Sequence, residues 1–103
     1  MEHLIQVIVP LRDNRGEALP RALFEEVHRG LTERFSGVTA HTRAPAQGSW
    51  QAPDGHTERE DVVMFEIFCE RLDRCWWHDY RRYLEARFEQ KEIHVRALPV
   101  EKL

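Results

Sequence analysis

Hydrophobic residues recur along this chain with two different periods. Four short segments are rich in branched apolar residues and alternate apolar with polar positions, which is typical of β-strands. The predicted strands are residues 4–11, 38–42, 61–70 and 92–100.

Two longer segments between these strands have helical spacing instead. Pro20 suits the first turn of a helix, and apolar residues then recur every three or four positions until Ser36 and Gly37. Asp73 is suited to cap a second helix. The predicted apolar stripes are Phe24, Val27, Leu31 and Phe35 in the first helix and Trp76, Tyr80, Tyr83, Leu84 and Phe88 in the second. We expect Trp77 to lie off the second stripe.

The resulting order is β-α-β-β-α-β, which predicts an α+β ferredoxin-like sandwich. Two helices would cover one face of a four-stranded antiparallel sheet with strand order 4-1-3-2. A chain of 103 residues closes one hydrophobic core, so we expect a single domain over residues 1–103.

Alternation along the strands assigns side chains to the two faces of the sheet. The positions predicted to face the helices are Ile5, Val7, Val9, Val63, Phe65, Ile67, Cys69, Ile93, Val95 and Ala97. Those predicted to face outward are Leu4, Gln6, Ile8, Val62, Met64, Glu66, Phe68, Glu70, His94, Arg96 and Leu98. The outward, open face is therefore apolar at its margins and polar at its centre.

The polar centre is a candidate ligand site, because it would combine a carboxylate, imidazoles and guanidinium groups. Gln6 would lie between Glu66 on one side and His94 and Arg96 on the other. The candidate ligand-binding residues are Gln6, His41, Arg43, Trp50, Glu66, His94 and Arg96. The alternative is structural: a cross-strand salt bridge from Glu66 to Arg96 or His94 that only sets the register.

The apolar margin exceeds what a small monomer normally exposes, so we expect a second copy of the chain to cover it. The candidate residues of this homodimer interface are Ile8, Met64, Phe68 and Leu98. A polar centre enclosed between two such faces would form a ligand cavity.

Residues 43–61 form an unusually long connection that contains Trp50. We expect it to be partly ordered and to fold Trp50 over the open face, as a lid or as an arm that reaches the second subunit. The alternative is that Trp50 fills the end of its own core.

Composition narrows the classes of function. The net charge of −3 lacks the basic footprint of a nucleic-acid-binding protein, and no apolar run is long enough for a membrane span or a signal peptide. We expect a cytoplasmic protein in which Cys69 and Cys75 are free thiols. No metal-ligand spacing and no cofactor motif occurs, so we predict neither a metal nor a cofactor.

The second predicted helix carries an adjacent His-Asp pair and several arginines, neither of which requires a functional explanation. His78 and Asp79 are consecutive and do not face each other on a helix, and Arg81, Arg82 and Arg87 are interrupted by acidic residues. We interpret both groups as solvated surface.

Several short motifs carry a resemblance: F-S-G-V-T (35–39), G-S-W (48–50), the acidic residues Glu58, Glu60 and Asp61, Y-R (80–81) and F-E-Q-K-E-I (88–93). Over roughly residues 24–96 the chain resembles a small bacterial domain family of unknown function, although Ser36 stands where that pattern has proline. The layout is also similar to dimeric α/β-barrel proteins, which include cofactor-free monooxygenases and small-molecule-binding domains.

Two functions follow as hypotheses. The first is a homodimeric binding module that holds a small anionic or aromatic metabolite beside Arg96 and His94. The second is a cofactor-free monooxygenase or isomerase in which His94 or Glu66 is the base. A base should be accessible beside an apolar pocket, whereas a structural cluster should be closed and fully hydrogen-bonded.

Overall fold

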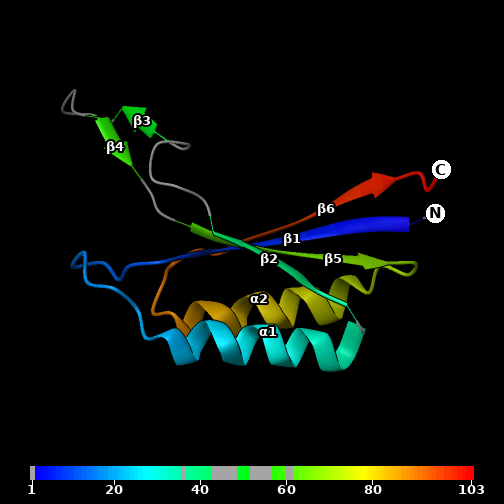
Figure 1. Cartoon of the computed structure of the whole chain (residues 1–103), viewed down its shortest axis with the longest axis horizontal. Coiled ribbons are helices and arrows are strands. Elements are labelled where there is room, and N and C mark those ends of the chain that lie inside the picture. Colours follow the sequence, from blue (N-terminus) through cyan, green and yellow to red (C-terminus); the bar gives the residue numbers. More distant parts are fainter. Residues whose placement is uncertain (1, 36, 43–48, 52–56, 60–61) are drawn as a thin grey trace.

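The computed structural model describes residues 2–35, 37–42, 49–51, 57–59 and 62–103 (Figure 1). Two helices and six strands occur in these residues, in the order β1 (Glu2–Pro10), α1 (Arg21–Phe35), β2 (Thr39–Thr42), β3 (Ser49–Gln51), β4 (Thr57–Arg59), β5 (Val62–Cys69), α2 (Arg74–Arg87) and β6 (His94–Val100).

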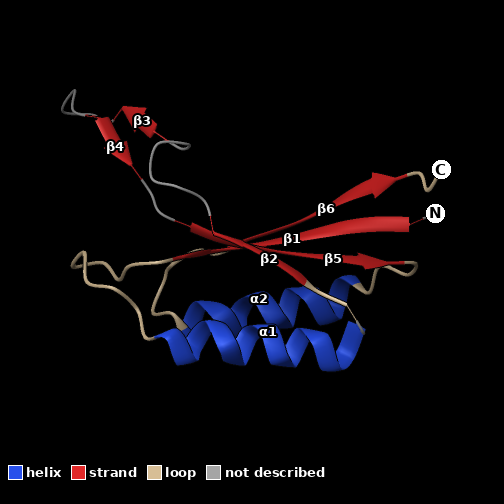
Figure 2. Ribbon diagram, in the orientation of Figure 1, coloured by secondary structure: helices blue, strands red, loops and turns tan. Residues whose placement is uncertain are grey.

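The main sheet has four antiparallel strands in the order β2-β5-β1-β6. Both helices lie on one of its faces and leave the other uncovered by helix (Figure 2). When only the four strands of this sheet are counted along the chain, β5 is the third and β6 the fourth, and the order is 2-3-1-4. This is the predicted 4-1-3-2 read from the opposite edge, so the predicted ferredoxin-like arrangement is confirmed. β1 and β5 are the central strands, and β2 and β6 are the edges.

The core lies between the sheet and the helices, and the predicted alternation accounts for most of it. The inward side chains of the two central strands are buried: Ile5, Val7, Val9, Val63, Phe65 and Ile67. Cys69 and Val95 are half-buried and pack against this cluster. Ala97 was expected to be buried and is exposed. It lies on edge strand β6, in a groove between that strand and α2.

Helix α2 begins where predicted but is rotated relative to the expected stripe. The Asp73 side chain accepts a hydrogen bond from the Trp76 backbone N–H at 3.0 Å, as an N-cap should. Trp77 is buried and stacks on Phe35 with ring centroids 5.2 Å apart, so the expectation for Trp77 was wrong. Tyr83, predicted on the stripe, is exposed.

The rotation has a simple reason. Trp76, Trp77 and Tyr80 are all aromatic and lie within an arc of about 100° on the helix, so period alone does not select which of them is the buried centre. The contact with Phe35 of α1 makes that selection.

The long connection between β2 and β5 contains a second, two-stranded sheet. β3 pairs antiparallel with β4, and Trp50 lies opposite Glu58 in the register. The segment was predicted to be partly ordered, but this hairpin was not predicted. Figure 1 shows the hairpin apart from the main sheet, on the side away from the helices. The Trp50 side chain lies outside the described residues, so its contact with the open face stays a prediction.

Candidate functional site

The register of the main sheet arranges the open face in rows that cross the strands. In the central row, Gln6 of β1 lies opposite Glu66 of β5 and opposite Arg96 of β6. On β2, Thr39 lies opposite Glu66 and His41 lies one outward position further along, opposite Met64. The register thus places Glu66, Gln6 and Arg96 on one line across three strands, with His41 in the adjacent row at the β2 edge.

Side-chain hydrogen bonds connect this line from one edge strand to the other. Arg96 Nε donates to Gln6 Oε1 at 2.6 Å, and Gln6 Nε2 donates to Glu66 Oε2 at 3.0 Å. The other carboxylate oxygen of Glu66, Oε1, lies 2.8 Å from Nε2 of His41. We call Arg96, Gln6, Glu66 and His41 the polar row.

The polar row differs from the salt bridge considered as an alternative. Glu66 makes no direct contact with Arg96, because the Gln6 amide lies between them and bonds to each. The acidic partner of the row pairs instead with His41, whose side chain is 49% exposed against 24% for Glu66. Both oxygens of Glu66 and both polar atoms of the Gln6 amide are therefore already engaged.

The ends of the row remain more open than its centre. Arg96 is exposed, and among the described residues only its Nε takes part in a hydrogen bond. The two terminal nitrogens of this guanidinium can therefore hold a carboxylate or phosphate group in their plane. The chemistry that the row offers to a ligand is anion binding at its β6 end.

An apolar row runs beside the polar row. Leu4 of β1 lies opposite Phe68 of β5 and Leu98 of β6. Phe68 is 64% exposed and Leu98 is 39% exposed, which are large values for such side chains. We call Phe68, Leu4 and Leu98 the apolar row.

On the other side of the polar row, Ile8 lies opposite Met64 and His94. Met64 was expected to be exposed and is only 4% exposed, so that expectation was wrong. Little of Met64 remains to be buried by a partner, although its sheet position faces outward as predicted. The exposed apolar surface is concentrated at Phe68 and Leu98 instead.

The remaining candidates are not brought into the polar row. His94 is exposed and makes no hydrogen bond or ion pair with any residue that the structure describes. It borders a groove of about 130 Å³ together with Ile8 and Val62. Arg43 lies outside the described residues, as does the side chain of Trp50.

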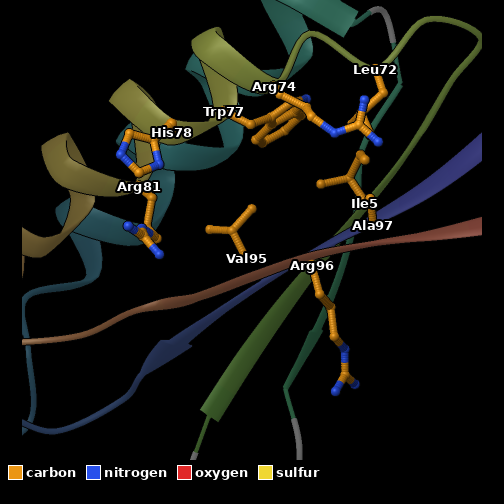
Figure 3. Close-up of a pocket in the computed structure, with 9 residues that line it drawn as sticks. All are labelled: Ile5, Leu72, Arg74, Trp77, His78, Arg81, Val95, Arg96 and Ala97. Atoms are coloured by element: carbon orange, nitrogen blue, oxygen red, sulfur yellow. The ribbon is translucent and has the colours of Figure 1, made fainter.

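Sequence reasoning missed a second group of residues. Arg74, His78 and Arg81 line a groove of about 230 Å³ between α2 and β6 (Figure 3). His78 and Arg81 had been interpreted as solvated surface. The signal that could have found the group is spacing, because positions 74, 78 and 81 share one face of a helix.

No family model matches the chain, and no curated protein matches it. Among solved structures, a phage SAM lyase in complex with S-methyl-5′-thioadenosine is similar, with a TM-score of 0.59 and 14% sequence identity. The match covers 94% of this chain and 80% of the lyase chain. At this identity the likeness shows the fold alone. In the described part of the chain, neither helix has the length and apolar character needed to cross a membrane.

Proposed function

We propose that this chain is a small-molecule-binding module whose ligand lies on the open face of the sheet, between two copies of the chain. The observation that carries the proposal is the polar row. It is a hydrogen-bonded line of side chains across a whole sheet face, with an exposed guanidinium at one end and a large apolar row beside it.

The two rows together define the chemistry of the ligand. Arg96 would bind an anionic group, because its terminal nitrogens are free to form a bidentate pair. The apolar row lies two residues further along the strands than the polar row. Its side chains Phe68, Leu4 and Leu98 would bind a flat apolar or aromatic part of the ligand. The proposed ligand is therefore a small anionic metabolite with an aromatic or apolar part.

A second copy of the chain would close the site. Sites for small molecules usually bury most of the ligand surface, and an open sheet face does not do so by itself. A two-fold pairing of open faces would bury Phe68 and Leu98 of both copies and enclose the polar rows. Burial of each such side chain contributes very roughly 1.5–3 kcal/mol before the entropic cost of association.

The similar lyase supports a small-molecule site on this fold, because that protein was solved with a bound nucleoside thioether. The alternative function, a cofactor-free monooxygenase or isomerase, needs a base with a free lone pair. Both oxygens of Glu66 already have partners, which favours a binding role for the polar row, so His94 is the candidate base of the alternative: it is exposed beside the groove of about 130 Å³.

Oligomeric state is the first test. We expect the native chain to be a dimer by light scattering at tens of micromolar and Phe68→Asp to be monomeric, because the substitution would place carboxylates in the interface. Tyr83→Asp is the control, since Tyr83 is also aromatic and exposed but belongs to α2. A monomeric native chain would contradict the proposed dimer.

Ligand binding is the second test. We would screen a library of aromatic carboxylates, nucleoside monophosphates and S-methyl-5′-thioadenosine by thermal shift. A ligand that binds only the folded state, present at 100 times its Kd, should add about 2.7 kcal/mol of stability. The shift should be lost in Arg96→Met and kept in Arg82→Met, which removes an exposed arginine of α2. Equal loss in both variants would place the ligand elsewhere.

A further inference from the structure

The groove between α2 and β6 lies on the helix side of the sheet, away from the polar row. Its floor contains the buried side chains of Ile5 and Trp77, and its strand wall is the consecutive run Val95, Arg96 and Ala97. Figure 3 shows the Arg96 side chain pointing away from α2, toward the open face. The guanidinium of Arg96 is thus not part of the groove, while its strand segment is.

The helix wall is basic and has no acidic partner. Arg74, His78 and Arg81 line it, and none of the three forms an ion pair or a side-chain hydrogen bond with another described residue. The Nε of Arg81 is buried without any hydrogen-bond partner. A buried N–H without an acceptor costs free energy, because it has lost its hydrogen bond to water, and an acceptor from outside the chain would supply the missing hydrogen bond.

The strand wall has unused hydrogen-bonding capacity as well. Among the strands that the structure describes, β6 is an edge of the sheet, so the backbone groups of one of its sides have no partner in them. Ala97, on the helix-facing side of this strand, is exposed and leaves room above the backbone. Pro99 has no N–H and limits strand addition to the part of β6 that precedes it.

We infer that this groove binds an extended acidic peptide, which adds as a fifth strand beside β6. Its backbone would pair with the free side of β6, and acidic side chains at alternate positions would meet Arg74, His78 and Arg81. Alternate strand residues are about 6.6 Å apart, while Arg74 and His78 are separated by about 6 Å along the helix axis and His78 and Arg81 by about 4.5 Å, so the spacing matches best at Arg74 and His78.

Charge selects this occupant over a second copy of the chain. Antiparallel pairing of two β6 strands would extend the sheet across a two-fold axis perpendicular to it. Arg74, His78 and Arg81 of both copies would then lie on the same face of the extended sheet, next to the paired strands. Like charges so placed disfavour the pairing, whereas carboxylates are complementary to it. A cavity of about 230 Å³ is also small for a whole metabolite but accommodates a few peptide side chains.

The test uses the full chain and a fluorescein-labelled peptide in which Glu and Val alternate over five residues. Fluorescence anisotropy should show binding that weakens as salt is raised, and a peptide of alternating Lys and Val should not bind. The double variant Arg74→Ala, Arg81→Ala should bind at least tenfold more weakly, while Arg82→Ala should stay within twofold of the native chain. Ala97→Glu should also abolish binding, because it fills the groove with a carboxylate.

Hydrogen exchange distinguishes strand addition from simple ion pairing. The Glu-Val peptide should slow exchange at β6 amides between Val95 and Leu98, and far-UV circular dichroism should confirm that each variant is folded. Three results would overturn the inference: no binding of the Glu-Val peptide, equal binding of a scrambled peptide with adjacent glutamates, or full competition by millimolar benzoate or inorganic phosphate without protection of β6. The last result would assign the groove to small anions.

Discussion

The two faces of the main sheet are built from the same strands and have opposite character. On β1 and β5, six apolar side chains toward the helices are at most 6% exposed, and the described residues include no buried polar or charged side chain; the six are Ile5, Val7, Val9, Val63, Phe65 and Ile67. The residues that alternate with them point to the open face. There Phe68 is 64% exposed, and the polar row crosses all four strands. A shift of one residue along a strand thus separates the packed core from the exposed face that carries the polar row.

The comparison shows what each face can tolerate. The covered face is close-packed against two helices, so loss of volume leaves a cavity. On the open face, solvent reaches exposed side chains such as Phe68 and Leu98 in a single copy and can replace a lost contact. Substitutions on the two faces should therefore differ in size and in the property that they change.

The largest effect is expected from Phe65→Ala, which removes a fully buried ring from the covered face. It should lower the free energy of unfolding by about 3–5 kcal/mol, measured by urea denaturation of dilute protein. The matched substitution Phe68→Ala removes the same side chain from the same strand on the open face, and should cost less than about 1 kcal/mol. Equal losses would mean that the open face is covered within one copy.

A smaller effect is expected within the polar row. Gln6→Met keeps the unbranched shape of the side chain but removes both hydrogen bonds of the amide, and should cost about 1 kcal/mol because water partly replaces them. A double-mutant cycle with Glu66→Met should reveal coupling of at least about 0.5 kcal/mol. Additive losses would contradict an energetic coupling between Gln6 and Glu66.

The smallest effect at neutral pH is expected from Tyr80→Phe, and it should grow in alkali. Burial, with the nearby Tyr83 and Glu26, raises the pKa of Tyr80 well above its usual range. Above about pH 10 the unfolded chain releases this proton and the folded chain keeps it, so stability falls as pH rises. Urea midpoints between pH 8 and 11 should therefore fall less steeply in Tyr80→Phe than in the native chain. Parallel pH profiles would contradict this cause.

Sequence reasoning succeeded where a local rule was sufficient. Period-two alternation identified the inward residues of the central strands, and it placed Gln6 between Glu66 and Arg96, because a register shift of one residue would expose the core. It failed where a second element decides burial. Trp77 is buried because α1 supplies Phe35, and Ala97 is exposed because α2 leaves an open groove beside the edge strand.

The sequence by itself determined the order of the two helices and the four strands of the main sheet, their antiparallel pairing and the residue types on each face, since these depend on period, capping and turn chemistry along the chain. Only the tertiary structure decided that the Gln6 amide joins Arg96 to Glu66, that His41 is the partner of that carboxylate, and that three basic residues of α2 face the free edge of β6. These outcomes depend on distances between elements far apart in the chain, which local periodicity does not contain.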